Sequence, residues 1–252
     1  MQKKKKISAG ILIIGNEVLS GRTQDLNVLF ISNWLNNNCG ISVNEVRIIP
    51  DIKQRIIFNV KDLSKKFSYV FTTGGIGPTH DDITSSSIAS AFKVKHQYNK
   101  EAYLILEKYY GKKKFNISRK KMAKIPDTSL LIHNPSSAAP GFLIKNVFCL
   151  PGVPSILRSM FPNIKKYIIK GPKTLSSTIN LLTYESKIAL GLEKIQKAYL
   201  RKKVEIGSYP FFKNGKVSVA IVSRSIFKKH LLSCETKIKI MARNKNIKIL
   251  KN

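Results

Sequence analysis

The chain has 252 residues, of which 43% are hydrophobic, and this composition is that of a globular protein with a full core. No apolar run approaches the roughly 20 residues of a membrane helix, so we expect no membrane partner. The basic start, Met1–Lys6, runs directly into a strand pattern, and we predict no signal peptide. Cys39, Cys149 and Cys234 are odd in number and far apart, which favours a cytoplasmic protein with reduced thiols.

The formal net charge of +31 has two explanations. A strongly basic chain can neutralise the phosphates of nucleic acids. Alternatively, the charge reflects compositional drift, because Lys, Asn and Ile are abundant throughout the chain and Lys takes the place of Arg. Outside Lys3–Lys6 the only run of three lysines is Lys112–Lys114, and the others are spread along the sequence. We therefore favour drift, with a secondary role in attracting anionic substrates and no specific nucleic-acid partner.

The first third of the chain alternates between strand and helix patterns. Strands are predicted at Ile7–Ile14, Ile41–Ile49 and Tyr69–Phe71, and helices at Gln24–Asn38, Ile52–Leu63 and in a small-residue segment ending at Phe92. Strand–helix repeats of this kind form a parallel sheet with helices on both faces. The predicted fold class is therefore α/β, a three-layer sandwich with a mostly parallel sheet.

The following segment is predicted to complete this domain. Helices are expected at Asn99–Tyr110, Asn116–Ala123 and Ser155–Ile169, a strand at Leu130–His133, and a hairpin between Phe142–Ile144 and Val147–Leu150. Gly171-Pro172 is typical of a domain boundary. We predict one domain over residues 1–170 and a second over residues 171–252.

The second domain is predicted to be small and α+β. Its expected elements are strands at Leu175–Leu182, Val204–Tyr209 and Val217–Val222, helices at Ser186–Leu200 and over residues 226–242, and a turn at Lys213–Lys216. None of these segments carries an obvious chemical motif.

The most informative stretch follows the strand that ends at Phe71. Gly74, Gly75 and Gly77 permit backbone angles that are closed to other residues. A strand, a glycine-rich turn and a helix N-terminus together form a phosphate cradle. Asp81 and Asp82 lie at the same helix N-terminus. Their carboxylates would repel a phosphate unless a cation bridges the carboxylates and the phosphate, which indicates a divalent metal. The alternative is a tight turn with an aspartate as helix cap, but a cap does not need three glycines.

Four carboxylates follow the ends of predicted parallel strands: Glu17, Asp51, Asp81 and Asp82. Ligands of open α/β sheets bind beyond the carboxyl ends of the strands. We therefore expect these side chains to meet at one site.

Four motifs occur in order at suitable spacing. They are Gly15–Gly21, Thr73–Thr84, Asn134-Pro135 with Ala139–Phe142, and Leu150–Gly152. Together they resemble the MoaB/Mog molybdopterin-binding fold, and more closely the N-terminal region of competence/damage-inducible protein A (CinA). The segment Ile206–Pro210 is similar to the region that follows this fold in CinA-like proteins and in some eukaryotic FAD synthases.

The resemblance implies an activity. Molybdenum-cofactor members adenylylate a pterin phosphate with carboxylates that match Asp82 and resemble Asp51. CinA-like members are associated with metal-dependent cleavage of ADP-ribose and similar compounds, and the FAD-synthase relatives with FAD hydrolysis. The deamidase domain of full-length CinA is missing from this chain, so we expect no deamidase activity. Oligomers are typical of the fold, and we expect a homo-oligomer.

The resemblance also implies the roles of individual residues. The catalytic carboxylates would be Asp82, Asp81 and Asp51, and a divalent metal (Mg, Mn or Co) would be held by Asp81, Asp82 and Glu17. The substrate-binding set would be Gly74, Gly75, Gly77, Thr79, Arg119, Lys120, Asn134 and Gly152. Within this set, Arg119 and Lys120 would take the distal phosphate.

Other positions are assigned no catalytic role or depart from the family. Lys121 is predicted to be a solvated basic residue, and His80, equally suited to base and positioning roles, is left out of the catalytic set. The family usually has Gly-Thr in place of Ser137-Ala138, and a second proline and an acidic residue in place of Val153 and Ile156.

Two classes of function stay open at this point. The first is a metal-dependent nucleotide pyrophosphohydrolase acting on ADP-ribose, FAD or a related dinucleotide. The second is a molybdopterin or pterin-phosphate-binding protein without turnover. The retained carboxylates favour the enzyme, and the departures from the family motifs favour binding.

Overall fold

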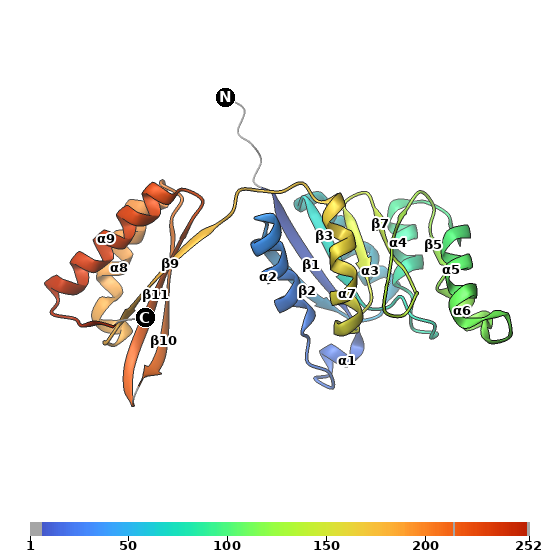
Figure 1. Cartoon of the computed structure of the whole chain (residues 1–252), viewed down its shortest axis with the longest axis horizontal. Coiled ribbons are helices and arrows are strands. Elements are labelled where there is room, and N and C mark those ends of the chain that lie inside the picture. The colour runs from blue at the N-terminus through green and yellow to red at the C-terminus, as the bar shows by residue number, and fades with distance from the viewer. Residues whose placement is uncertain (1–6, 214, 251–252) are drawn as a thin grey trace, which may run out of the picture. The chain divides into compact units, whose positions relative to one another are not determined.

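The structure is a computed structural model that describes residues 7–213 and 215–250. The chain folds as two compact units, residues 1–171 and residues 172–252 (Figure 1). We call them the N-terminal unit and the C-terminal unit.

The N-terminal unit is built on a six-stranded sheet. Its strands are β1 (Ser8–Ile14), β2 (Ser42–Ile49), β3 (Tyr69–Thr73), β6 (Leu130–Ile132), β7 (Gly141–Ile144) and β8 (Val147–Leu150). They lie in the order β2-β1-β3-β8-β7-β6. Strands β2, β1, β3 and β8 are parallel, while β7 runs antiparallel to both of its neighbours. The predicted α/β fold with a mostly parallel sheet is confirmed.

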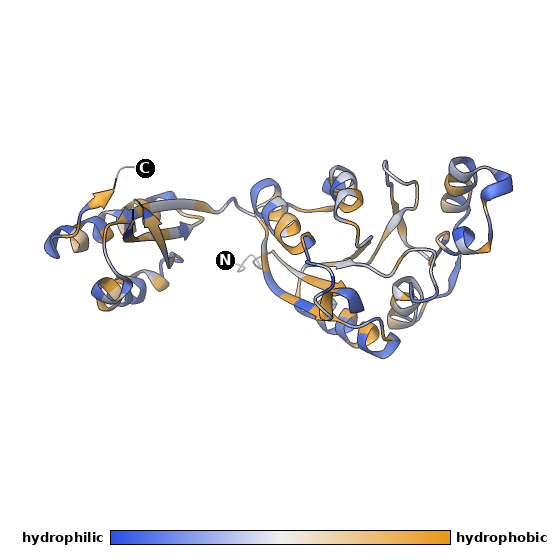
Figure 2. Cartoon of the chain, turned by 90° about the horizontal axis from the view of Figure 1, so that it is seen from below, coloured by the Kyte–Doolittle hydropathy of each residue, from blue (hydrophilic) through white to orange (hydrophobic). Residues whose placement is uncertain are grey.

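Helices cover both faces of this sheet. Helices α2 (Asn27–Cys39) and α7 (Pro154–Ile164) pack on one face, and α3 (Lys53–Lys66), α4 (Thr84–Phe92) and α5 (Lys100–Tyr110) on the other. Successive residues of a strand point to opposite faces of the sheet. Ile13 therefore packs in the core beneath α2 and α7, and Leu12 and Ile14 pack in the core beneath α3, α4 and α5. Many of the helices are apolar on one side and polar on the other (Figure 2).

Several short elements were not predicted from the sequence. Helix α1 (Asn16–Leu19) follows β1, and β4 (His96–Tyr98) pairs with β5 (Lys124–Pro126) as a separate antiparallel ribbon. A 3-10 turn at Lys112–Lys114 follows α5, whereas helix α6 (Ile117–Lys121) lies within the helix predicted at Asn116–Ala123. Too few residues form each of these elements for a periodic pattern to show.

Some boundaries also differ from the prediction. Helix α2 begins at Asn27, where the Asp25 carboxylate accepts the Val28 amide hydrogen bond at 2.9 Å, rather than near Thr23. The helix predicted to reach Ile169 ends at Ile164 and continues only as a 3-10 turn over Lys165–Tyr167.

The C-terminal unit is the predicted α+β fold. Its elements are β9 (Leu175–Leu181), α8 (Glu185–Leu200), β10 (Glu205–Lys213), β11 (Lys216–Ser225), α9 (Lys228–Asn244) and β12 (Ile249–Leu250). The strands form an antiparallel sheet in the order β10-β11-β9-β12, the split βαβ arrangement. Ile179 and Ile221 of the sheet pack with Ile188 and Ile238 of the helices. Asn214, in the predicted turn, lies outside the described residues.

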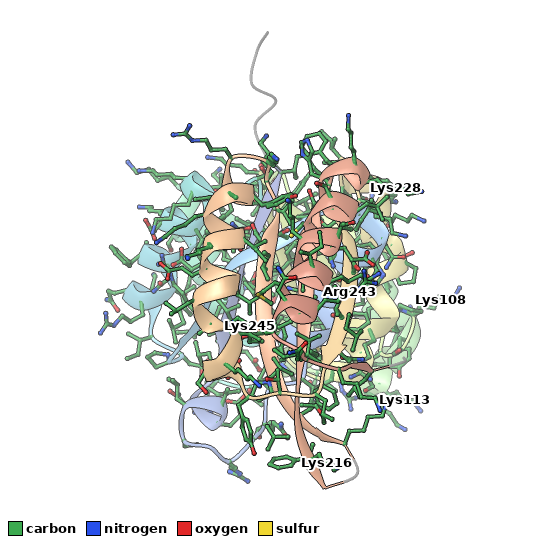
Figure 3. All side chains as sticks on the ribbon, turned by 90° about the vertical axis from the view of Figure 1, so that its left-hand side faces the viewer. Lys108, Lys113, Lys216, Lys228, Arg243 and Lys245 are labelled. Carbon is green, nitrogen blue, oxygen red and sulfur yellow. The ribbon has the colours of Figure 1, made fainter. Side chains whose placement is uncertain are left out.

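The basic residues are spread over the surfaces of both units. Lys228 begins α9 and Arg243 lies in its last turn, Lys216 begins β11, and all three are exposed, as are the other labelled residues of Figure 3. Among the described residues, no helix is both long and apolar enough to cross a membrane.

Candidate functional site

The loop that follows β3, Gly74–Gly77, which we call the glycine loop, is packed against the ends of β1 and β8. Gly74 has φ +99, and a Cβ at this position would lie 2.1 Å from the carbonyl oxygen of Ile14 at the end of β1. Its amide donates to the Leu150 carbonyl at 3.1 Å. A Cβ at Gly152 would lie 3.4 Å from the Gly74 Cα. The loop after β3 therefore meets the ends of β1 and β8, and no side chain fits at Gly74.

Two further glycines let carboxylates approach the loop. A Cβ at Gly75, where φ is +67, would lie 2.2 Å from Thr84 Oγ1 and 3.5 Å from Asp51 Oδ1. A Cβ at Gly77 would lie 2.7 Å from Asp82 Oδ2. The glycines thus provide both the backbone conformation and the space beside Asp51 and Asp82.

Asp82 organises the loop rather than capping the helix. Its Oδ2 accepts hydrogen bonds from the Thr79 amide at 2.8 Å and from the Thr79 hydroxyl. The residue before α4 is Ile83, and no side chain in the described part of the chain caps the helix. The alternative reading of an aspartate cap is therefore wrong for this turn.

Asp51 lies at the end of β2 and holds the adjacent turn. Its Oδ2 accepts the Asn16 amide at 2.9 Å. Burial raises the pKa of Asp51, the Asn16 hydrogen bond opposes this, and the charges of Glu17, Asp81 and Asp82 raise it further. The charges of the other three predicted carboxylates thus act on Asp51, and a common site for all four stays a prediction.

Asp81 is exposed, and its pKa is shifted in the other direction. Hydrogen bonding at Thr79 lowers the pKa of Asp81, with help from the charges of His80 and Lys121. At neutral pH the carboxylate of Asp81 is therefore ionised and able to attract a cation.

The described side chains do not form a complete metal cage. Within the described part of the chain, no group of three or more His, Cys, Asp or Glu side chains could hold a metal ion. Mg²⁺ is commonly held by one or two carboxylates together with substrate phosphates and water. One or two carboxylates of the predicted set would satisfy that mode, whereas Asp81, Asp82 and Glu17 do not form a three-ligand group, and the metal stays a prediction.

The basic residues of α6 point in different directions. The Arg119 guanidinium lies 4.2 Å from the Tyr110 ring centre and donates to the Lys114 carbonyl, and Lys120 lies over aromatic rings. Lys121 donates to the Thr79 carbonyl instead. The prediction that Lys121 is merely solvated was wrong, and phosphate contacts from Arg119 and Lys120 stay predictions.

The Asn134 side chain forms its hydrogen bonds within its own loop. Its Nδ2 donates to Ser137 Oγ at 2.7 Å and to the Ala139 carbonyl at 2.8 Å, and its Oδ1 accepts two backbone amides. Ala138 has φ +61, which non-glycine residues rarely adopt. Asn134 therefore shapes the loop in which the chain departs from the family motif, and its contact with a ligand stays a prediction.

One residue beside the site was missed by the sequence reasoning. Asn27, the first residue of α2, is buried, and its Nδ2 donates to the Gly152 carbonyl at 2.8 Å. Its Oδ1 has no hydrogen-bond partner among the residues that the structure describes. The only available signal was a polar residue at the start of an apolar helical pattern. Such a residue is usually interpreted as an exposed surface residue.

A pocket of ≈ 410 Å³ lies beside the glycine loop. It is lined by residues from the loop, α4, the β4–β5 ribbon and the strand β7: Ile76, Gly77, His80, Asp82, Ile83, Ser85, Ser86, His96, Lys121, Met122, Lys124, Ile125, Pro140 and Phe142. His96, Lys124, Ser85 and Ser86 were not predicted as site residues. They meet here because the unpredicted β4–β5 ribbon packs against α4.

Two families match the chain along its length. Residues 10–171 match the family described as probable molybdopterin binding domain, and residues 173–250 match the middle domain of FAD synthase.

Individual proteins agree with these matches. A protein from Archaeoglobus fulgidus is 34% identical over 85% of this chain and 90% of its own length. A CinA-like protein from Fusobacterium nucleatum is 33% identical, and a probable FAD synthase from Caenorhabditis elegans is 30% identical. These alignments cover 71% and 82% of this chain but only 45% and 44% of the two relatives.

A solved structure supports the fold. The crystal structure of the protein CinA from Thermoplasma acidophilum has a TM-score of 0.60 and 32% sequence identity, and the match covers 64% of this chain and 99% of that one. The glycine loop described above lies within the matched family region, residues 10–171. The chain therefore belongs to the molybdopterin-binding domain family and is CinA-like.

Proposed function

We propose that the protein is a metal-dependent nucleotide pyrophosphohydrolase that cleaves ADP-ribose, FAD or a related dinucleotide. The observation that carries this proposal is the approach of Asp51 and Asp82 to a loop whose glycines leave the backbone bare. Such a loop suits a diphosphate, and the carboxylates suit the cation that accompanies it.

The residues of the chain have distinct tasks in this proposal. The backbone of Gly74–Gly77 receives the diphosphate, and the Asp82 hydrogen bonds to Thr79 hold the loop in place. Asp81, Asp82 and Glu17 hold the cation, and Asp51 accepts a proton from the attacking water. A bound divalent cation neutralises phosphate charge and lowers the pKa of water.

The raised pKa of Asp51 suits the role of a base. A general base works best when its pKa lies near the operating pH, and burial together with three neighbouring carboxylates moves that of Asp51 upward.

A second candidate is a pterin-phosphate-binding protein without turnover. Two observations favour it: the described side chains form no complete metal cage, and residues 10–171 match a family described by molybdopterin binding. In this case the same loop would hold a single phosphate group, and Asp51 would serve only to fix the Asn16 turn.

Purified protein incubated with ADP-ribose, FAD and related dinucleotides, with Mg²⁺, Mn²⁺ or Co²⁺, tests the proposal. Chromatography should resolve two monophosphates from each cleaved dinucleotide, because the bond between the phosphates breaks. No cleavage with any metal, combined with tight binding of a pterin phosphate, would favour the second candidate.

A further inference from the structure

The sheet of the C-terminal unit has two unlike faces. Both helices of the unit pack on one of them, where Ile221 of β11 packs with Ile188 of α8 and Ile238 of α9 (Figure 1). Successive residues of a strand point to opposite faces, and residues paired across a ladder share a face. The side chains that alternate with these core residues therefore lie on the side away from α8 and α9, which we call the open face. On β10 and β11 they are Glu205, Gly207, Tyr209, Phe211 and Lys213 with their ladder partners Arg224, Val222, Ala220, Ser218 and Lys216.

Two aromatic side chains stand on the open face. Tyr209 and Phe211 belong to β10, which lies at the edge of the sheet. Tyr209 is 49% exposed, and a Cβ at Gly207 would lie 2.9 Å from its Oη and 3.0 Å from its Cε2. Gly207 thus leaves room for the Tyr209 ring to lie back along the strand while about half of the side chain faces solvent. Phe211, two residues further on, is half-buried.

The neighbouring strand β11 continues this surface with apolar side chains. Ala220 pairs with Tyr209 and Val222 pairs with Gly207, and both side chains are half-buried. The middle of the open face therefore carries aromatic rings beside small apolar side chains. Aromatic rings on a four-stranded sheet are a common platform for the bases of single-stranded nucleic acids.

Basic residues border the open face at both ends. Lys213 and Lys216 form the ladder pair nearest the turn, and Arg224 pairs with Glu205 at the far end. All four side chains are exposed, and Figure 3 shows Lys216 at the tip of the β10–β11 hairpin. Like charges directly opposite each other destabilise a sheet, so an anion that binds between the two lysines would relieve a repulsion.

The charge of the C-terminal unit also favours an anionic partner. Residues 172–252 contain 18 lysines and arginines but only four acidic residues, all of them glutamates. Glu193 and Glu235 are each paired with a lysine of the same helix. Charge complementarity therefore points to a polyanion, and the aromatic rings select one class of polyanion. A single-stranded nucleic acid can stack its bases on the rings, whereas a duplex keeps its bases stacked on one another.

We propose that the open face binds single-stranded nucleic acid, with bases stacked on Tyr209 and Phe211 and phosphates beside Lys216 and Arg224. Aromatic rings accept any base, so the binding has no sequence preference. The inference goes beyond the proposed hydrolysis of dinucleotides and uses no residue of the glycine loop. Its success or failure therefore leaves that proposal untouched.

Fluorescence anisotropy with the full chain tests this surface. The probe is a labelled oligonucleotide of about 12 uridines, a length within the range that single-strand-binding domains cover, and the comparison is a duplex with the same number of phosphates. At about 100 mM salt, where phosphate contacts alone are weakened, the single strand should bind roughly tenfold more tightly than the duplex, because only its bases reach the rings. Equal affinities would mean that charge alone attracts the nucleic acid and would overturn the proposal.

Tyr209 and Phe212 give a matched pair of variants. Phe212 is 78% exposed on the same strand, but the alternation of side chains places it on the opposite face from Tyr209. Tyr209→Ala should weaken binding of the single strand about tenfold, because it removes a ring on which a base stacks, and should leave duplex binding unchanged. Phe212→Ala removes a more exposed ring and should change neither affinity. Equal losses in the two variants would contradict the assignment of the open face.

Two further variants separate the base contact from the phosphate contact. Tyr209→Trp keeps a stacking ring and should bind the single strand as tightly as the wild type, which excludes a folding defect as the cause of the loss in Tyr209→Ala. Arg224→Gln should make the fall of log K with log salt less steep by about 0.7 and should keep the preference for the single strand. An unchanged salt dependence would contradict the phosphate contact, and an equal loss in Tyr209→Trp and Tyr209→Ala would overturn the stacking contact.

Discussion

Gly75 shows how strictly one residue can be required at the site. It has φ +67, and a Cβ there would meet Thr84 Oγ1 at 2.2 Å. Gly75→Ala should therefore lower the free energy of unfolding by more than the roughly 1–2 kcal/mol that left-handed backbone alone costs an L-residue. Chemical denaturation measures this difference.

Gly21 is the matched control, because its φ is +74 and a Cβ there would meet nothing within 4 Å. Gly21→Ala should show the backbone cost alone. Equal losses of stability in the two variants would mean that the contact with Thr84 is readily relieved.

His96 gives the fold a defined pH dependence. Its pKa is lowered from 6.5 by burial, so the native state favours the neutral ring. The resulting stabilisation is present above the pKa that His96 has in the unfolded chain. It is lost as the pH falls from that pKa through the lower pKa of the folded state. Between about pH 7.5 and about pH 5.5 the wild type should lose more thermal stability than His96→Gln, which keeps an N–H donor for the Lys124 carbonyl. Parallel melting curves for the two proteins would contradict this account.

The sequence predicted which types of residue lie at the site, but it did not predict which basic side chain contacts the glycine loop. Four carboxylates and three glycines were predicted at strand ends, and the charges of Glu17, Asp81 and Asp82 do act on Asp51. In contrast, Lys121 rather than Arg119 reaches the loop. Consecutive residues of a short helix point about 100° apart, and only the packing of α6 decides which of them meets Thr79.

At the scale of elements, helix α5 offers a direct test of local signals. The Asn99 side chain accepts the Ala102 amide at 2.9 Å and caps the helix. Asn99→Ala should cost about 1 kcal/mol of stability, whereas Asn99→Asp should be nearly neutral. Thermal melting of both variants measures the difference, and an unchanged Asn99→Ala would show that packing alone holds the end of α5.

The long elements were predictable because periodic apolar patterns record which face is buried. The strands β1 and β3 and the helices α3 and α5 lie where these patterns placed them. The β4–β5 ribbon has three residues in each strand, and its strands are separated by helices α5 and α6. Its pairing is a tertiary contact, so the pocket that it helps to line was also missed.

At the scale of the whole molecule, the net charge of +31 leads to a prediction about binding to duplex DNA. If the charge is drift with a role in attracting small anions, binding to duplex DNA should be weak and independent of sequence. It should also fall steeply between about 50 and about 200 mM salt. A fluorescence titration of labelled duplex measures this, and tight binding at physiological salt would contradict it.

The central claim, that a carboxylate-held metal acts at the glycine loop, is tested most directly at Asp82. Asp82→Asn keeps an oxygen for the Thr79 amide, so the loop should persist. Removal of the charged ligand should lower dinucleotide cleavage by orders of magnitude. A bound metal contributes several kcal/mol to the transition state, and each ~1.4 kcal/mol is tenfold in rate.

The measurement is the cleavage rate of ADP-ribose by wild type and Asp82→Asn with saturating metal, together with the melting temperature of each protein with and without metal. We predict that cleavage collapses in the variant and that metal stabilises only the wild type, by ordinary linkage. Undiminished cleavage together with the same metal-induced stabilisation in Asp82→Asn would contradict the account.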